Sequence, residues 1–174
     1  AGAHNIMIRR YEPDPSLEGK RLDDIARARL EEPLDTAISM LIKGGASIIS
    51  FNMNDSDLEA FMKQPWTMTC TDGGLVEFGT GSEHPRAYGA FPRKLRRYAL
   101  DQNVITIEQA VHSSSGMPAA VFGIKDRGEV RTGAYADVLV WDPKTITDVA
   151  TYEEPHAYSK GMDFVFVNGR AAVV

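Results

Sequence analysis

The residues of this chain whose types and spacing are suited to chemistry lie between Thr67 and Arg93. The run TMTC, at 67–70, is β-prone and leads through Thr71 into Asp72-Gly73-Gly74. A carboxylate at the C-terminal end of a strand can ligate a metal ion or exchange a proton with a water molecule. Asp-Gly-Gly is also ordinary turn chemistry, so these residues alone leave both interpretations of Asp72 open.

Three further side chains accompany Asp72. Cys70 precedes it by two residues and would share its face of an extended strand, although a small buried cysteine is the more ordinary interpretation. His84 and Arg86 flank Pro85, and the guanidinium fork of Arg86 matches a carboxylate with two parallel hydrogen bonds. His84 either holds this loop or contacts a substrate. A solvated loop arginine is the competing interpretation of Arg86.

Composition excludes several classes of function. A net charge of −5 over 174 residues argues against a nucleic-acid surface, and we interpret the basic run Arg93–Arg97 as a solvated helix face. The single cysteine excludes an internal disulfide framework and favours a cytoplasmic setting. No apolar run is long enough to span a membrane. The other histidines, at positions 4, 112 and 156, show no metal-ligand spacing with one another.

The elements around these residues alternate between helix and strand. The periodicity predicts a helix over 22–30, a second helix over 34–42 with Leu34, Ile38, Leu41 and Ile42 on its apolar face, and a helix that follows Asn54 and ends at Pro65. Strands are predicted at 5–11, 46–52 and 66–71. This order is typical of a parallel sheet covered by helices.

After the glycine-rich loop at 73–89 the pattern becomes helical and then β-rich. We place Pro92 in the first turn of a helix, predict a capping box between Thr106 and Gln109, and expect a short helix at 118–123. Beyond residue 127 the chain is β-rich, and Asn168-Gly169 between apolar runs predicts a two-residue hairpin. We place a domain boundary near residues 126–130, with 142–163 as a surface excursion.

Taken together, several of these stretches resemble one family. They are HPRAYGAFPRKLRRY, TIEQAVHSSSGMPAAVFGIKDRGEVRTGAYADVLVWDP and FVFVNGR, in that order. The chain is similar over nearly its whole length to the C-terminal part of N-acyl-D-amino-acid deacylases, the D-aminoacylase branch of the amidohydrolase superfamily. The stretch RGEVRTGAYADVLVWD is shared by many amidohydrolases, whereas HPR-x-x-G-x-FPR after the Asp-Gly turn indicates the deacylase branch.

The resemblance implies an α/β fold: the C-terminal part of a metal-dependent (β/α)8 TIM-like barrel over residues 1–126, then the C-terminal part of a small β-sandwich over residues 127–174. It implies zinc, as one or two ions, and makes Asp72 the general base and then the acid of amide hydrolysis, with a possible role as zinc ligand. Arg86 matches a position that holds the substrate carboxylate, and His84 is carried over as its neighbour. Cys70 is not equated with the metal-binding cysteine of the family.

The other metal ligands of the family have no counterpart in this sequence, and zinc needs about three or four protein ligands. We therefore expect a fragment of a zinc-dependent enzyme that is inactive alone, binds no zinc alone, and is completed by the missing N-terminal part of the barrel or by self-association. One alternative is a cyclic-amide hydrolase of the dihydropyrimidinase or dihydroorotase type. The other is a non-catalytic, metal-free association module.

Overall fold

The computed structural model describes residues 2–173 and divides into two compact units. The first unit comprises Ala1–Asn54, Gly73–Ala87 and Thr151–His156. The second comprises Asp55–Asp72, Tyr88–Ala150 and Ala157–Val174. Among the helices of the described residues, none has the length and apolar character needed to cross a membrane.

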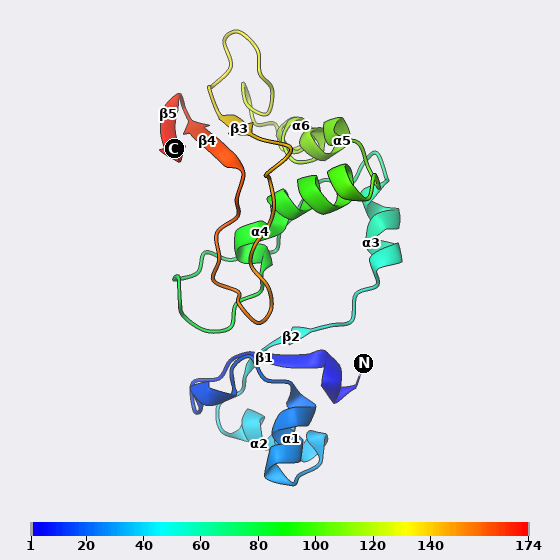
Figure 1. The fold of residues 1–174 in the computed structure, drawn as a ribbon, viewed down its shortest axis with the longest axis vertical. Coiled ribbons are helices and arrows are strands. Elements are labelled where there is room, and N and C mark those ends of the chain that lie inside the picture. Colours follow the sequence, from blue (N-terminus) through cyan, green and yellow to red (C-terminus); the bar gives the residue numbers. More distant parts are fainter. Residues whose placement is uncertain (1, 174) are drawn as a thin grey trace. The chain divides into compact units, whose positions relative to one another are not determined.

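The first unit is built from a strand pair and two helices (Figure 1). Strand β1 (Ile6–Arg10) pairs with β2 (Ser47–Ser50), and helices α1 (Leu22–Arg29) and α2 (Pro33–Ile42) pack side by side. Two short 3-10 turns, η1 (Ala3–Asn5) and η2 (Pro15–Leu17), complete it. The buried core contains Ile8, Tyr11, Leu17, Leu22, Ile25 and Met40. Both predicted helices and the strands near 5–11 and 46–52 are confirmed.

One expectation for this unit is wrong. β1 and β2 are antiparallel, with Met7 opposite Ile49, so this pair is not part of a parallel βα alternation. The predicted apolar residues of α2 are largely exposed in this structure: Leu34, Leu41 and Ile42 are 70%, 67% and 81% exposed, whereas Thr36 and Met40 are buried. Periodicity identifies an apolar face but does not identify what covers it.

The second unit contains a helical cluster. It consists of α3 (Asp55–Met62), α4 (Arg86–Arg93) from Tyr88 onward, the π-helix η3 (Lys94–Asp101), α5 (Ile107–His112) and α6 (Gly116–Val121). Ala99, Ile105 and Ala110 form its buried core. The capping box at the start of α5 is confirmed, since the Thr106 hydroxyl accepts from the Gln109 N–H and the Gln109 side chain accepts from the Thr106 N–H.

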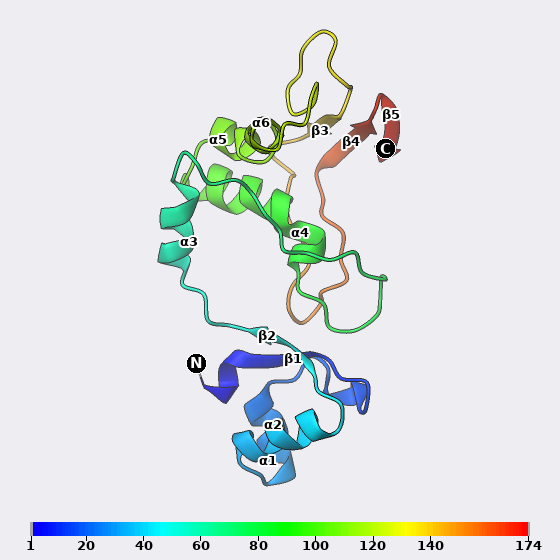
Figure 2. The ribbon, with the colours of Figure 1, turned by 180° about the vertical axis from the view of Figure 1, so that it is seen from behind.

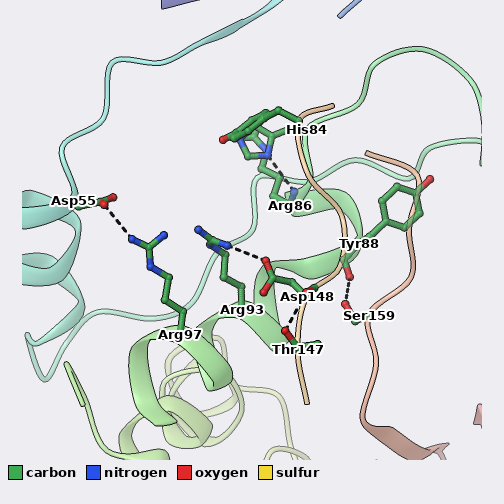
Figure 3. Close-up of polar contacts among 10 residues, drawn as sticks. Asp55, His84, Arg86, Tyr88, Arg93, Arg97, Thr147, Asp148 and Ser159 are labelled. Carbon is green, nitrogen blue, oxygen red and sulfur yellow. Dashed lines mark hydrogen bonds and ion pairs between the residues drawn. The ribbon is translucent and has the colours of Figure 1, made fainter. Parts of the chain in front are cut away.

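Pro92 does not lie in a first turn, because α4 begins at Arg86 and contains Pro92 in its last turn. Proline has no N–H, so the carbonyl of Tyr88, four residues earlier, loses its helical donor. The Ser159 hydroxyl donates to that carbonyl at 2.8 Å (Figure 3). The helix continues past the proline as the wider η3 turn, which begins at Lys94.

The C-terminal end of the chain forms a three-stranded antiparallel sheet in the order β3 (Val138–Trp141), β4 (Met162–Val167) and β5 (Arg170–Val173), as both views show (Figures 1 and 2). The predicted hairpin is confirmed. Asn168 and Gly169 both have positive φ, 51° and 76°, which the two central residues of this turn type require. The Asp137 carboxylate accepts from the Asn168 N–H at 2.8 Å and holds the turn.

Candidate functional site

The segment that carries Asp72 is not a strand. Residues 66–72 form an extended or turning loop, and within the described part of the chain no strand pairs with them. A β-prone sequence becomes a strand only when a neighbouring strand accepts its hydrogen bonds. Here the Thr69 N–H donates instead to the carbonyl of Ser113, at 2.8 Å, so this segment is held against the end of α5.

Asp72 lies at the point where this segment turns. Its φ is 47°, in the left-handed region that aspartate adopts more readily than most residues, and the residue is exposed. An exposed aspartate at a turn is suited to exchange a proton with water. The same geometry also fits a residue that only forms the turn. Cys70 is also exposed, so the expectation that it is buried is wrong.

A buried lysine contacts the Asp72 segment, and sequence reasoning missed it. Lys94 is 8% exposed, and its Nζ donates to the Thr69 hydroxyl at 2.5 Å and to the Ser113 hydroxyl at 2.7 Å. The run Arg93–Arg97 is therefore not wholly a solvated face. The available signal was spacing, because Lys94 precedes the buried Tyr98 by four residues and so shares its side of a helix.

The charge of Lys94 depends on this burial. Removal of the ammonium from water lowers the pKa of Lys94 below its ordinary value of 10.5. By contrast, the neighbouring arginines pair with carboxylates: Arg93 with Asp148 at 2.9 Å and Arg97 with Asp55 at 3.1 Å (Figure 3). Lys94 is thus distinguished from them by having hydroxyl partners.

His84 and Arg86 lie in the first unit, whereas Asp72 belongs to the second. The Arg86 N–H donates to Nδ1 of His84 at 3.1 Å, so this nitrogen carries no proton. In the neutral ring the proton is then on Nε2, which faces the Tyr152 hydroxyl at 3.2 Å. Both ring nitrogens of His84 therefore have partners within the unit, as expected of a residue that holds its loop. The Arg86 residue is exposed.

Aromatic packing continues from His84 into the first unit. The rings of His84 and Tyr152 meet edge to face, with centroids 5.1 Å apart, and Tyr152 packs in the same way on Phe51 at 4.6 Å. The Arg21 guanidinium lies 3.8 Å from the centre of the Phe51 ring. Tyr152 and Arg21 also line an open concavity, which neither His84 nor Arg86 lines. These contacts connect the loop before α4 to the sheet of the unit.

The described residues do not form a metal centre by themselves. Between residues 2 and 173, no group of three or more histidine, cysteine, aspartate or glutamate side chains is arranged to hold a metal ion. Zinc takes about three or four protein ligands, and Asp72 is the one candidate ligand that the sequence analysis identified. The donor set of the described residues alone does not fit zinc.

The chain is similar to proteins of known activity over nearly its full length. Residues 7–173 match the profile of the amidohydrolase family. The D-aminoacylase of Alcaligenes xylosoxydans xylosoxydans is 37% identical over 96% of this chain and 33% of its own length. A dihydroorotase from Lactobacillus acidophilus is 34% identical over only 63% of this chain and 25% of its own.

Structural similarity agrees with the sequence matches. The N-acyl-D-glutamate deacylase from Bordetella bronchiseptica, solved with zinc and a phosphonate that mimics the tetrahedral intermediate, superposes with a TM-score of 0.89 at 35% identity. The alignment covers 97% of this chain and 34% of that one. The chain therefore spans about a third of the length of the relatives it matches.

Proposed function

Because this chain belongs to the amidohydrolase family, we propose that the protein of which it forms part hydrolyses the amide bond of N-acyl-D-amino acids. The products are a carboxylate and a free D-amino acid. The observation that carries this proposal is the similarity to N-acyl-D-amino-acid deacylases across nearly the whole chain, in both sequence and structure. On this proposal residues 1–126 belong to the barrel of the enzyme and residues 127–174 to its small sandwich domain.

Asp72 is the proposed general base and acid. Its carboxylate takes a proton from the water that attacks the acyl carbon, and it delivers that proton to the amide nitrogen as the C–N bond breaks. The position of Asp72 supports this role, because the residue is exposed at a turn.

Arg86 is the proposed anchor for the substrate α-carboxylate. It is exposed at the start of α4, and a guanidinium binds a carboxylate through two parallel hydrogen bonds. His84 positions this residue, since its ring accepts from the Arg86 N–H and contacts Tyr152. A direct contact between His84 and substrate is the alternative role.

Zinc is the proposed cofactor, as one or two ions. The similar N-acyl-D-glutamate deacylase was solved with zinc, whereas the described residues of this chain supply no more than one ligand from the candidate site. The remaining ligands then come from residues outside this chain, either from the rest of the parent protein or from an associated copy. A metal site polarises a carbonyl and lowers the pKa of bound water when it is occupied.

The proposed function is tested on the whole enzyme with an Asp72→Asn variant. We expect kcat for N-acetyl-D-methionine to fall at least ~100-fold, because the amide cannot accept the proton. Zinc content, measured in parallel, shows whether Asp72 is also a ligand. Asp57→Asn is the matched control, since Asp57 is an exposed carboxylate of the same unit. An Asp72→Asn enzyme that retains its rate would remove Asp72 from the mechanism.

A second candidate function is the hydrolysis of cyclic amides, which the partial similarity to dihydroorotases favours. A panel of N-acetyl-D-amino acids, hydantoins and dihydroorotate presented to the unmodified enzyme decides between them. Turnover of the cyclic substrates alone would leave the family assignment in place and replace the substrate class. Absence of turnover on the whole panel would favour a non-catalytic association module.

A further inference from the structure

We propose that Lys94 is a positioning residue that ties the Asp72 segment to the end of helix α5 through a set of hydroxyl hydrogen bonds. This inference deepens the proposed function, on which it rests, because it assigns a support to the proposed base. Lys94 itself is not placed in contact with substrate. Its partners Thr69 and Ser113 lie in the same unit as Asp72, and so does Ser114, which contacts Thr69.

The direction of each hydrogen bond in this network follows from counting protons. Ser114 donates its only hydroxyl proton to the carbonyl of Ala110, at 2.7 Å, so it can only accept from Thr69, whose oxygen lies 2.7 Å away. Thr69 therefore donates its own hydroxyl proton to Ser114, and its oxygen accepts from Lys94.

Ser113 has the same limitation. Its hydroxyl proton points to the carbonyl of Gln109, at 2.6 Å, so its oxygen can only accept from Lys94. The two hydroxyls that face Lys94 can thus only accept from it, and Lys94 donates both hydrogen bonds.

The backbone supports the same connection. The Thr69 N–H donates to the Ser113 carbonyl, so Thr69 is held at both its main chain and its side chain. Asp72 follows Thr69 by three residues, which limits its distance from this anchor to about 10 Å. The segment pairs with no strand among the described residues. The hydrogen bonds of Thr69 to Ser113 and Lys94 therefore hold it in place of the hydrogen bonds between paired strands.

The position of Lys94 is set by the elements on both sides. It is the first residue of η3, directly after Arg93, whose guanidinium is paired with Asp148. Its neighbours Leu95 and Ala99 contribute to the core of the unit. Lys94 is thus attached to a packed element, whereas Asp72 is on a loop. The contact between Lys94 and Thr69 therefore restrains the loop.

The test uses the whole enzyme with Lys94→Met and Thr69→Val. Each substitution removes one partner of the hydrogen bond and keeps a side chain of similar size. We expect kcat to fall about 10- to 100-fold while KM changes less than twofold, because a displaced base impairs the chemical step. Thr69→Ser keeps the hydroxyl and should restore the rate. Lys125→Met, at an exposed lysine of the same unit, is the matched control.

A second readout does not depend on catalysis. Amide hydrogen exchange of the peptide covering 67–72 should become faster in Lys94→Met and in Thr69→Val, and the double variant should exchange no faster than the more affected single variant. If Lys94→Met fails to fold, the exchange rates and kcat of Thr69→Val are compared with those of Thr69→Ser.

Unchanged exchange at 67–72 in the valine variant would overturn the inference, as would a Thr69→Ser enzyme as impaired as Thr69→Val. These outcomes are separate from failure of the proposed function, which is read from Asp72→Asn. An active Asp72→Asn enzyme with faster exchange in Thr69→Val would reject the role of Asp72 in catalysis and keep the anchor.

Discussion

The residues of the motif HPR-x-x-G-x-FPR have different structural roles. His84 belongs to the loop before α4 and Arg86 is the first residue of α4, while Gly89 and Arg93 contact the loop that contains Asp148. Arg93 pairs with the Asp148 carboxylate, and a Cβ placed on Gly89 would lie 2.7 Å from the Cβ of Asp148. The second half of the motif therefore serves packing within its unit, and only the first half is a candidate for substrate recognition.

Gly89→Ala gives a prediction in which two effects have opposite signs. In a helix interior, alanine is more favourable than glycine by roughly 0.5–1 kcal/mol. At Gly89 we expect the reverse, a loss of about 1–3 kcal/mol in the free energy of unfolding, because the methyl group overlaps Asp148. Thermal unfolding of the whole protein measures it. Gly74→Ala is the control, since a Cβ there meets nothing within 4 Å.

A raised melting temperature for Gly89→Ala would show that the loop moves away at little cost. The packing account of Gly89 would then be wrong.

At the scale of elements, one proline lies just before the change from α4 to η3, and one serine replaces the hydrogen bond that the proline removes. Pro92 removes the donor for the Tyr88 carbonyl, and Ser159, far along the sequence, supplies another. An unsatisfied buried carbonyl costs free energy comparable to a lost hydrogen bond. This contact explains how a proline is accommodated inside a helix that continues, and it links α4 to the segment before β4 (Met162–Val167).

Ser159→Ala should lower the free energy of unfolding by about 1 kcal/mol, because the Tyr88 carbonyl loses its donor. In a Pro92→Ala background the restored N–H serves that carbonyl, and the same change should then cost close to nothing. Urea unfolding of the four proteins in this double-mutant cycle measures the difference. An equal cost in both backgrounds would show that the serine acts independently of the proline.

At the scale of the whole molecule, this chain leaves apolar surface uncovered. Leu34, Leu41 and Ile42 on α2 are largely exposed, and so are several apolar side chains of the C-terminal sheet, among them Leu139 and Val173. Exposed apolar faces of this kind are typical of interaction surfaces. Since the chain spans about a third of its relatives, we expect the rest of the parent protein, or a second copy, to cover them.

Residues 1–174 expressed alone should self-associate, contain no stoichiometric zinc and hydrolyse no N-acyl-D-amino acid, whereas the whole parent protein should bind zinc and be active. Sedimentation velocity, metal analysis and release of D-methionine from N-acetyl-D-methionine measure the three properties. A monomeric, zinc-loaded and active chain would show that the site is complete within these residues.

Local features of this protein are determined by the sequence itself. Helices α1 and α2, the capping box of α5 and the Asn168-Gly169 hairpin were all predictable, because their signals lie within a few residues of one another. The candidate residue Asp72 was found in the same way, and its catalytic assignment still depends on a family resemblance.

The tertiary structure decided the features that depend on distant partners. The run at 66–72 is not a strand because no strand pairs with it in the described residues. Pro92 lies inside a helix, where Ser159 supplies the donor that the carbonyl of Tyr88 lacks. Lys94 is buried because Thr69 and Ser113 surround its amine with acceptors. Burial and hydrogen bonding depend on groups brought together from different parts of the chain. Periodicity along the sequence is local and does not predict which distant groups meet.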